Sequence, residues 1–362
     1  GGRLYPGYKI KLLQREIIDG VQITRVPLYP SHDSSAIRRV MTYASIAWSI
    51  LIYGLFFARK PDAIYVFHPP LTIGVVAVLL RIFRRAPVVY DIQDMWPDTL
   101  RAVGMVPSER VLAIVGRVCV WVYRHVDRIV VLCPGFKQLL IERGVESKKV
   151  DVIYNWCDAE VLGAENSALP VEFPDSSRFR VVFAGNMGKA QGLETVLEAA
   201  QQLERWRPHV SFVFVGSGVE LPDLRAKSES LGLQNVLFLP RMPMQEIGAV
   251  LRAADVLLVH LKDDPLFAIT VPSKTQAYMA AGRPIIMGVR GNAAHLIEDA
   301  DCGVVAIPEN ADSIVAAVDR LCQMSKAERE NMGGRGKAYY QEHLSLATGC
   351  KRFGQIFREV AL

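Results

Sequence analysis

The stretch VPSKTQAYMAAGRPII (residues 271–286) predicts a helix followed at once by a buried strand. Pro272 suits the first turn of a helix, Ser273 can cap its exposed N–H groups, and Gly282 can end it in the left-handed conformation. Lys274 is unexpected, because the start of a helix favours negative charge and a lysine there is unfavourable unless an anion faces it. The stretch therefore predicts a helix–strand unit that binds an anion at its helix start.

The same alternation of strands and helices extends outward from this stretch over most of the chain. Apolar strands are predicted at 62–68, 87–92, 127–133, 151–155, 179–186, 210–218, 236–240, 255–261 and 302–307. Helices are predicted at 71–83, 107–125, 193–205, 221–231 and 244–253, and about the last fifty residues are largely helical. Apolar strands separated by helices are typical of parallel sheets that are covered on both faces.

Two such sheets are predicted, because the irregular residues 160–178 interrupt the pattern and contain two prolines. We predict Rossmann-like α/β domains at 1–165 and 166–340, and a C-terminal helix at 341–362 that can cross back to the first domain. Open α/β sheets bind ligands at the carboxyl ends of their strands, so two facing sheets predict one shared interdomain site.

The composition limits the classes of protein that the chain can belong to. Its 362 residues, 51% of them hydrophobic, are enough for two domains. The six cysteines are scattered without metal-site spacing, which favours a reducing compartment and predicts no metal or cofactor. Residues 1–165 carry 21 Lys and Arg against 15 Asp and Glu, too weak a basic bias to indicate nucleic acid. No cleavable signal peptide is visible.

The apolar segment MTYASIAWSILIYGLFFA (41–58) has basic residues on both sides, at Arg38–Arg39 and Arg59–Lys60. Three interpretations are open: a buried core helix, a helix that docks on a membrane, and a short membrane span. The segment is barely long enough to span, and basic residues at both ends fit a helix at an anionic surface better. We therefore expect peripheral contact with the inner, cytoplasmic face of the membrane through residues 38–60.

Three glycine turns follow predicted strands in the second half, at 185–188, 216–218 and 288–291. Glycine lets the backbone approach a ligand, although each turn could equally be an ordinary connection. None matches GxGxxG or the P-loop, which disfavours kinases and simple dinucleotide enzymes. Lys189 lies directly after the first turn, and Lys274 lies at the start of its predicted helix. Two lysines at neighbouring strand ends would suit a diphosphate.

Motifs that carry a family resemblance are spread over the whole chain. They are YPGYK (5–9), IDGVQITRVPLYPSH (18–32), FHPPL (67–71), DMWPD (94–98), NWCD (155–158), AGNMGKAQGLETVLEAA (184–200), VPSKTQAYMAAGRP (271–284) and DCGVV (301–305). Together they resemble the GT-B sugar transferases of glycosyltransferase family four, in particular the bacterial WbuB-type branch. The resemblance implies metal-independent, retaining transfer from a nucleoside-diphosphate sugar on the C-terminal domain to an acceptor on the N-terminal domain.

The chain also departs from the pattern of that family. Family members usually carry two glutamates eight residues apart, where this chain has Ile269 and Ala277. Asn186 and Gln191 stand where arginine and lysine are common, and Gln93 stands where a histidine near the donor sugar is common. Related chains begin with a strand, a glycine loop and a helix before YPGYK, so we expect an N-terminal domain without its first strand and helix.

On the acceptor side, Asp94 and His68 are the candidate catalytic residues. Asp94 follows a predicted strand beside Trp96, whose flat ring suits a sugar, and two further aspartates lie within the same eight residues. The alternative role of Asp94 is to cap the turn before Pro97. His68 precedes two prolines at another strand end, where it can bond an acceptor hydroxyl or act as a satisfied cap.

On the donor side, Arg241 follows the predicted strand 236–240, where relatives hold the nucleobase, and is the candidate nucleobase residue. Asp264 and Glu298 are candidates for the hydroxyls of the donor sugar. The alternatives are a solvated loop for Asp264 and a helix surface for Glu298.

These observations predict a retaining glycosyltransferase that uses a nucleoside-diphosphate sugar, with UDP preferred to GDP. The acceptor would be a lipid-linked sugar or a saccharide in bacterial surface polysaccharide biosynthesis. The leaving diphosphate would be stabilised by Lys189, Lys274 and the N–H groups around Gly188 and Ser273, without a metal.

Two other functions remain open. A GT-B nucleotide-sugar epimerase would need titratable groups at the sugar, which Asp94 and His68 could supply. An inactive nucleotide-binding subunit would fit the absence of both family glutamates.

Overall fold

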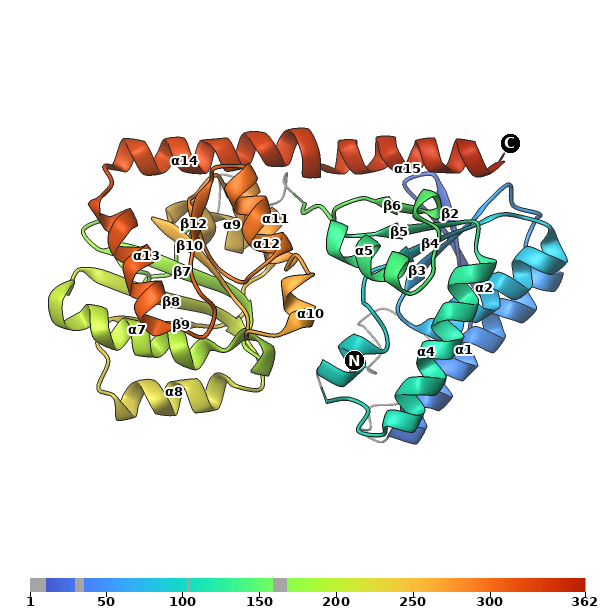
Figure 1. Cartoon of the computed structure of the whole chain (residues 1–362), viewed down its shortest axis with the longest axis horizontal. Coiled ribbons are helices and arrows are strands. Elements are labelled where there is room, and N and C mark those ends of the chain that lie inside the picture. Colours follow the sequence, from blue (N-terminus) through green and yellow to red (C-terminus); the bar gives the residue numbers. More distant parts are fainter. Residues whose placement is uncertain (1–10, 30–35, 103, 159–167, 362) are drawn as a thin grey trace. The chain divides into compact units, whose positions relative to one another are not determined.

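The computed structural model describes residues 11–29, 36–102, 104–158 and 168–361 (Figure 1). Internal contacts divide the chain into two compact units. The first unit comprises Gly1–Val131, Lys137–Val152 and Phe353–Leu362, and the second comprises Leu132–Phe136 and Ile153–Arg352. Each unit is therefore assembled from separate stretches of the chain.

The first unit is built on a four-stranded parallel sheet with the strand order β3-β4-β5-β6. The strands are β3 (Ile64–His68), β4 (Val88–Ile92), β5 (Arg128–Val131) and β6 (Val150–Val152). The helices are α1 (Ala36–Phe56), α2 (Leu71–Arg84), α3 (Asp98–Ala102), α4 (Glu109–His125), α5 (Pro134–Glu142) and the short η1 (Ser147–Lys149). Every residue of β4 is buried, as expected for an inner strand of a covered parallel sheet.

A β-hairpin that the sequence analysis did not predict lies outside this sheet. Its strands are β1 (Gln14–Ile18) and β2 (Val21–Arg25), which pair antiparallel. The two residues between them, Asp19 and Gly20, both have positive φ, at 49° and 81°. This is the arrangement of a type I′ turn, for which the Asp-Gly pair in the sequence is a strong signal.

The second unit is built on a six-stranded parallel sheet with the order β12-β11-β10-β7-β8-β9. The strands are β7 (Phe179–Asn186), β8 (Val210–Ser217), β9 (Val236–Leu239), β10 (Val256–His260), β11 (Ile285–Gly288) and β12 (Gly303–Val305). The helical elements are η2 (Lys189–Gln191), α7 (Leu193–Trp206), α8 (Leu221–Ser230), α9 (Met244–Ala253), α10 (Pro265–Ala268), α11 (Lys274–Ala281), α12 (Asn292–Asp299), α13 (Ala311–Gln323), α14 (Lys326–Tyr339), η3 (Tyr340–Leu344) and α15 (Leu346–Ala361).

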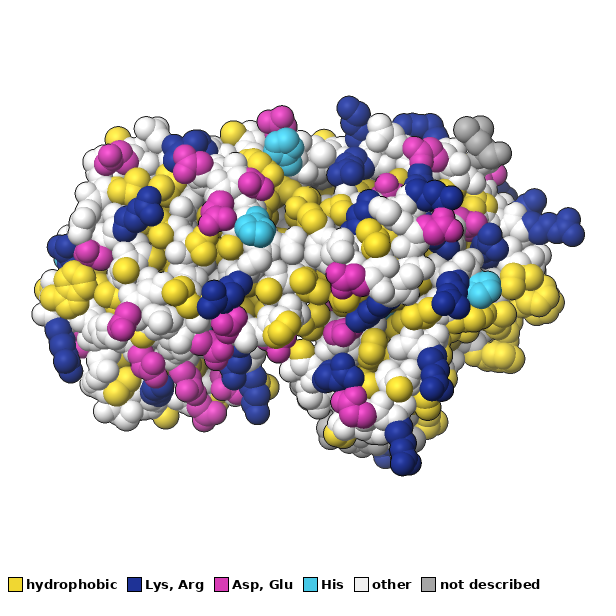
Figure 2. Space-filling model, viewed as in Figure 1, with side chains coloured by type: hydrophobic (Ala, Val, Ile, Leu, Met, Phe, Trp, Pro, Cys, Tyr) yellow, Lys and Arg dark blue, Asp and Glu magenta, His cyan; other side chains and the backbone are white. Residues whose placement is uncertain are grey.

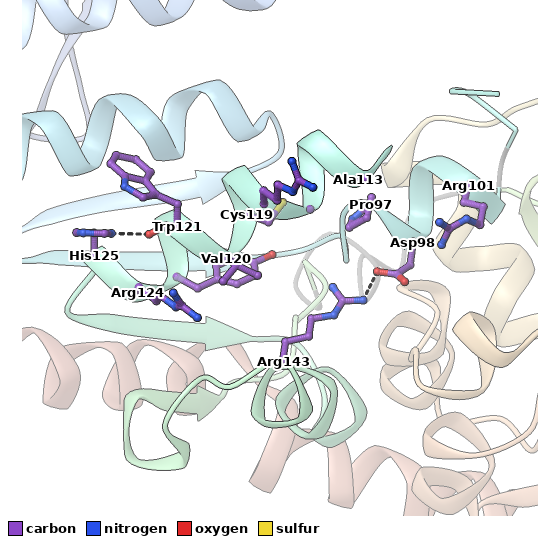
Figure 3. A pocket seen from close by; sticks show the side chains of 13 residues that line it. Pro97, Asp98, Arg101, Ala113, Cys119, Val120, Trp121, Arg124, His125 and Arg143 are labelled. Carbon is purple, nitrogen blue, oxygen red and sulfur yellow. Dashed lines mark hydrogen bonds and ion pairs between the residues drawn. The ribbon is translucent and has the colours of Figure 1, made fainter. Parts of the chain in front are cut away.

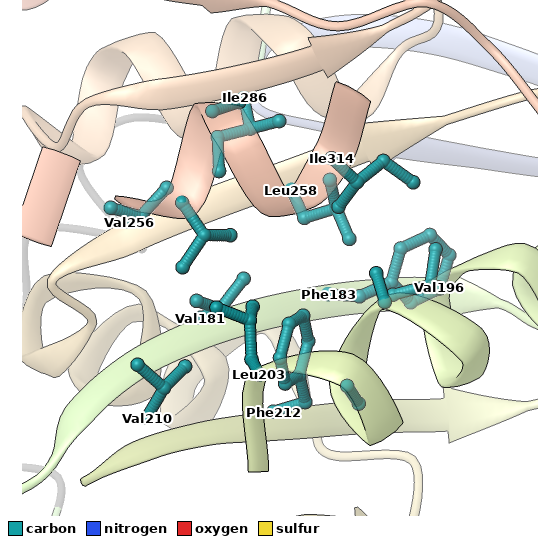
Figure 4. Close-up of a cluster of buried hydrophobic side chains, with 14 of the residues drawn as sticks. Val181, Phe183, Val196, Leu203, Val210, Phe212, Val256, Leu258, Ile286 and Ile314 are labelled. Carbon is teal, nitrogen blue, oxygen red and sulfur yellow. The ribbon is translucent and has the colours of Figure 1, made fainter. Parts of the chain in front are cut away.

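The core of the second unit lies between this sheet and the helices α7 and α13 (Figure 4). Val181 and Phe183 of β7 share this core with Leu258 of β10 and with Leu203 of α7. All four side chains are almost completely buried. Beyond this core, β7 ends at Gly185 and Asn186, where the glycine itself carries no side chain.

The helix α15 begins in the second unit, and its residues from Phe353 onward belong to the first. There the rings of Phe353 and Phe357 meet Tyr65 of β3 edge-on, with ring centroids 5.7 and 6.1 Å away. Glu359 forms an ion pair with Arg128 of β5. The end of the chain therefore covers part of the sheet that its first half builds.

Each strand and helix that the sequence predicts is present within a few residues of its predicted ends. The segment 41–58 forms most of α1, but its interpretation as a core helix is wrong, since none of the described side chains of α1 is buried. Trp48 is 65% exposed. Among the helices of the described residues, none is long and apolar enough to cross a membrane.

We expect Gly216→Ala to destabilise the protein by about 3 kcal/mol, because a Cβ there would lie 2.0 Å from the carbonyl oxygen of Gly185. The φ of Gly216, 146°, adds strain for any other residue. Gly232→Ala is the matched control, since Gly232 also has positive φ, 68°, but has open space around it. Thermal unfolding should show a much smaller loss for Gly232→Ala. Equal losses would mean that backbone strain alone, and not the close approach, explains Gly216.

Candidate functional site

The strand order of the second unit locates a candidate site. The first strand of this sheet in the sequence is β7, which lies in its middle. The next two strands, β8 and β9, extend the sheet on one side of β7, and β10 then pairs with β7 on the other side. The point between β7 and β10 is a topological switch point, where connections leave in opposite directions and a crevice opens at the strand ends. Gly185 and Asn186 end β7 here, and His260 ends β10.

Two of the predicted glycine turns lie side by side at this end of the sheet. Gly185 and Gly216 are partners in the β7–β8 ladder, and both have φ values that favour glycine, 142° and 146°. A Cβ on Gly218 would lie 2.1 Å from the carbonyl oxygen of Met187. The two turns therefore stack backbone against backbone, which only glycine permits.

Lys274 lies directly beneath the first of these turns. Its Nζ is 3.1 Å from the position that a Cβ on Gly185 would take, and 3.5 Å from the centroid of the Phe183 ring. Within the described residues this Nζ is enclosed and has no hydrogen-bond partner. Burial lowers the pKa of Lys274 to about 7. A buried amine without a carboxylate is an unfavourable group unless an anion joins it.

The start of α11 differs from the prediction in one respect. Ser273 has helical backbone angles (φ −59°, ψ −22°), and its side chain makes no capping bond, so the expectation that its hydroxyl caps the helix is wrong. Tyr278 holds α11 against β7 instead. Its hydroxyl accepts from the N–H of Ala184 at 2.7 Å and donates to the carbonyl of Ala184 at 3.1 Å.

The first glycine turn is bonded to a polar side chain that follows it in the sequence, that of Gln191. The N–H of Gly188 donates to Oε1 of Gln191 at 2.9 Å. The carbonyl of Gln191 in turn contacts Nδ1 of His260 at 2.7 Å, and Nε2 of His260 accepts from the N–H of Glu309 at 3.1 Å. The Gly188 N–H, one of the groups that the sequence analysis assigned to the diphosphate, is therefore bonded to Gln191 in this structure.

Lys189 is exposed and lines a cavity of about 140 Å³ with Lys262, Glu220 and Glu309. Lys274 does not line this cavity. The sequence predicted that the two lysines converge on one anion, and the structure places them in different surroundings. Lys262 was not predicted, although its position two residues after the end of β10 is a signal for this edge of the sheet.

The remaining donor-side candidates are spread over the second unit. Arg241 is exposed and follows β9, at the strand end where it was expected. Asp264 is the N-cap of α10, where its side chain accepts from the N–H of Leu266 at 2.8 Å. Glu298 is exposed near the C-terminal end of α12. A helix that follows a parallel strand runs back toward the opposite ends of the strands, so we expect Glu298 to lie away from the other candidates.

In the first unit, His68 and Asp94 lie at neighbouring strand ends, since the N–H of Gln93 donates to the carbonyl of His68 at 3.1 Å. The His68 ring is buried, and in the described structure neither of its nitrogens has a hydrogen-bond partner. Burial lowers the pKa of His68 to about 4, so the ring is neutral at pH 7. Its centroid lies 5.3 Å from that of Trp96, which is oriented edge-on.

Asp94 is partly buried, and this burial raises the pKa of its carboxyl group. Asp91, which the sequence analysis treated only as a neighbour, is the more deeply buried carboxylate. It accepts hydrogen bonds from the hydroxyl of Tyr65 and from Nε2 of Gln93. Burial raises the pKa of Asp91, and these two hydrogen bonds oppose the shift. Asp91 therefore positions Gln93, next to Asp94.

A larger cavity, of about 700 Å³, lies beside α4 in the first unit (Figure 3). Its lining includes Arg101, Arg117, Arg124, Arg143 and a single carboxylate, that of Asp98. The sequence analysis missed this cavity, although arginines seven residues apart on one helix are a readable signal. Within the described residues, no group of three or more His, Cys, Asp and Glu side chains is arranged to hold a metal ion.

Comparison with known families decides the class of this protein. Residues 168–339 match the family model described as glycosyl transferases group 1, and residues 6–156 match that of the glycosyl transferase 4-like domain. The chain is a glycosyltransferase. These matches cover both units and support the predicted membership of glycosyltransferase family four.

Curated relatives of the glycosyltransferase agree with this class. The chain is 25% identical to the Pseudomonas aeruginosa protein named "Probable glycosyltransferase WbjE", over 83% of this chain and 75% of that protein. It is 26% identical to the Escherichia coli protein named "Putative colanic acid biosynthesis glycosyl transferase WcaI", over 84% of this chain and 77% of that protein.

Solved structures confirm the predicted GT-B fold. A UDP-forming trehalose-phosphate synthase from Burkholderia xenovorans superposes with a TM-score of 0.76 at 15% identity, covering 99% of this glycosyltransferase and 93% of that chain. HepE from Anabaena, solved in complex with UDP-glucose, superposes with a TM-score of 0.66 at 16% identity, covering 90% and 84%.

We expect Lys274→Met to raise the melting temperature of the ligand-free glycosyltransferase at pH 6.5. The free energy of unfolding should rise by about 2–4 kcal/mol. Because the folded pKa of about 7 lies below the unfolded value of 10.5, the unfolded chain binds the extra proton between these pH values. The stability of the wild type therefore rises with pH in this window, and the advantage of the variant should shrink toward pH 10.

Differential scanning calorimetry from pH 6.5 to 9.5 measures this difference. An advantage that does not change with pH would contradict a depressed pKa at Lys274. Nucleotide binding provides the second measurement, since loss of a charged hydrogen bond should weaken it roughly 10- to 100-fold. Unchanged binding and kinetics would remove Lys274 from the site.

Proposed function

We propose that this glycosyltransferase transfers a sugar, with retention, from a nucleoside-diphosphate sugar to a lipid-linked or saccharide acceptor in bacterial surface polysaccharide biosynthesis. The unpartnered Nζ of Lys274 beneath the glycine turns is the observation that carries the proposal. UDP is the preferred nucleotide, which the UDP-glucose complex of HepE supports. The printed name of WcaI, which includes colanic acid biosynthesis, supports the proposed pathway class.

On the donor side, the diphosphate binds at the switch point above Gly185 and at the start of α11. Helix starts present N–H groups that have no partner within the helix and attract anions. Lys274 becomes charged when the diphosphate binds, because a nearby anion raises its pKa again. Its charge then stabilises the leaving diphosphate as negative charge develops on it, which lowers the barrier.

Other donor contacts follow from the positions of the predicted residues. Lys189, exposed at the turn, supplies a second, mobile cation for the phosphates, and Arg241 at the end of β9 contacts the nucleobase. Asp264 accepts from donor hydroxyls with the carboxylate oxygen that its capping bond leaves open. Glu298 is left out of the proposed site because of its place on α12.

On the acceptor side, Asp94 accepts a hydrogen bond from a neighbouring hydroxyl of the acceptor sugar and so orients the attacking hydroxyl. His68 is neutral near pH 7 and has two unsatisfied ring nitrogens, so it can donate to one sugar oxygen or accept from another. The bond between the anomeric carbon of the donor and its phosphate oxygen breaks as the acceptor oxygen bonds to that carbon on the same face, and the leaving phosphate takes the proton of the acceptor hydroxyl.

A lipid-linked acceptor requires contact with a membrane, and α1 offers an apolar face for it. Val40, Trp48, Ile52 and Phe56 are exposed large hydrophobic residues on this helix. Trp48, Ile52 and Phe56 follow one another at intervals of four residues, which keeps these three on one side of the helix, whereas Val40 lies farther around it. Such a face suits the boundary between head groups and acyl chains.

The C-terminal ends of α1 and α2 extend this apolar surface. Arg84 of α2 donates to the carbonyls of Leu55 and Ala58, which holds the two helix ends together. Phe56 and Phe57 at one end, and Ile82 and Phe83 at the other, are all more than half exposed. Basic residues follow both helices in the sequence, at Arg59, Lys60 and Arg85. Anionic lipid attracts each such residue by roughly 1 kcal/mol.

Incubation with labelled UDP-sugars, with and without a lipid-linked acceptor, tests the function. We expect transfer to the acceptor in the presence of EDTA. Conversion of the sugar without transfer would show an epimerase, and binding without any turnover would show a nucleotide-binding subunit. Transfer that requires added Mg²⁺ would contradict the metal-independent mechanism.

We expect Asp94→Asn to lower kcat for transfer roughly 100-fold or more, while the affinity for UDP stays within about two-fold. The neutral amide removes the carboxylate that orients the acceptor hydroxyl, but Asp94 belongs to the first unit, whereas the residues proposed for the nucleotide belong to the second. Asp62→Asn, an exposed aspartate just before β3, is the control and should retain full activity. If Asp94→Asn turns over substrate at the wild-type rate, Asp94 has no role in transfer and serves only in the turn before Pro97.

We expect the pair Trp48→Gln and Phe56→Gln to abolish most of the flotation of the protein with anionic vesicles, since both side chains are largely exposed on α1. Trp206→Gln is the matched control, because Trp206 is an exposed tryptophan in the second unit. The wild type should float better at low salt than at high salt. Equal flotation of all three proteins would contradict docking through α1.

A further inference from the structure

The exposed side of α4 carries an unusual stripe of residues. Arg110, Ile114, Arg117, Trp121 and Arg124 follow one another at intervals of four, three, four and three residues. These intervals bring all five to one side of a helix, and all five are exposed. The stripe therefore alternates cationic and apolar side chains, and Figure 2 shows basic and hydrophobic side chains over α4.

The C-terminal part of this stripe borders the cavity of about 700 Å³, which we call the α4 groove. Arg117, Trp121 and Arg124 line it from α4, while Pro97, Asp98 and Arg101 line it from α3 and the residue before it. Figure 3 shows Arg143 reaching in from the end of α5 toward Asp98. A concave site of this size holds a discrete chemical group, whereas a flat basic surface would only face one.

The charges of the groove are unbalanced. Asp98 pairs with Arg143, and Arg101 pairs with Glu109 at 2.7 Å. Arg117 and Arg124 have neither a hydrogen-bond nor a carboxylate partner among the described residues. These two arginines are separated by about 10 Å along the helix axis and line one cavity, so they leave it with positive charge that an anion would neutralise.

The chemistry of the ligand follows from these residues. Guanidinium groups bind phosphate oxygens with paired hydrogen bonds, and two of them can grip a diphosphate from both ends. Trp121 and Ile114 provide apolar surface next to the arginines, 37% and 57% exposed. The ligand therefore has an anionic diphosphate joined to an apolar chain.

The groove also lies next to the proposed acceptor site. Arg143 donates to the carbonyl of Trp96, and Pro97 and Asp98 of the groove follow Asp94 after only three and four residues. A sugar attached to a diphosphate in the groove therefore lies within reach of Asp94, since three residues span at most about 10 Å.

We propose that the α4 groove binds the diphosphate of a prenyl-diphosphate-linked sugar acceptor, with Arg117 and Arg124 as its phosphate ligands and Trp121 against the prenyl chain. The proposal rests on the proposed function, because it names the anionic group of the lipid-linked acceptor. It assigns acceptor recognition to α4, a part of the chain distinct from the membrane-facing α1.

Direct binding of farnesyl diphosphate to the full chain, measured by calorimetry, tests the groove without turnover. We expect Arg117→Gln and Arg124→Gln each to weaken binding about ten-fold, and the double variant to weaken it further. Arg110→Gln is the matched control, because Arg110 lies on the same stripe but does not line the groove. Unchanged binding in the double variant, or an equal loss for Arg110→Gln, would overturn the assignment.

Kinetics in neutral detergent, without anionic lipid, distinguish the acceptor from a lipid head group. We expect the double variant to raise KM for the lipid-linked acceptor at least ten-fold and to leave KM for the donor unchanged. A defect that appears only with anionic vesicles would assign the arginines to head groups and overturn the proposal. If the wild type binds farnesyl diphosphate through these arginines but transfers no sugar, the groove is supported and the proposed function fails.

Discussion

The close packing of β7 against β8 and α11 is the constraint on which the second unit depends. β7 lies between β8 and β10, and its end approaches β8 so closely that Gly216 has no room for a side chain, while a Cβ on Gly185 would press on the amine of Lys274. Tyr278, in the second half of α11, bonds both backbone groups of Ala184 and so fixes this helix to the same strand. The Nζ of Lys274 is enclosed between Phe183 and Gly185 next to these contacts, where it has no hydrogen-bond partner among the described residues.

The alternating strands and helices could be predicted because inner parallel strands are apolar throughout and glycines mark their ends. Details that depend on backbone angles could not be predicted in this way. Ser273 is a residue type that caps helices, but its own angles are helical, so its hydroxyl cannot reach the N–H groups ahead. The candidate lysines, Lys189 and Lys274, could be named from their positions in the sequence. That only Lys189 lines the small cavity depends on side-chain directions, which the spacing of residues does not determine.

The first unit holds its polar residues in a different way from the second. Asp91, Tyr65 and Gln93 satisfy one another within the structure, whereas His68 beside them is left with two unsatisfied nitrogens. A buried imidazole without partners is costly, and such a cost is retained most often at a site that a ligand completes. The sequence indicated His68 through its strand-end position, but it gave no sign that Asp91 would be the buried carboxylate.

The route of the chain has a consequence for biosynthesis. Residues Phe353 to Ala361 belong to the first unit, and their aromatic rings cover Tyr65. Domains generally fold in order as they leave the ribosome, N-terminal first. Here the first unit is incomplete until the last turns of α15 are added, and these turns are synthesised after the entire second unit. Until those turns have been synthesised, Tyr65 lacks the aromatic rings that pack against it, so the first unit is completed only after the second unit.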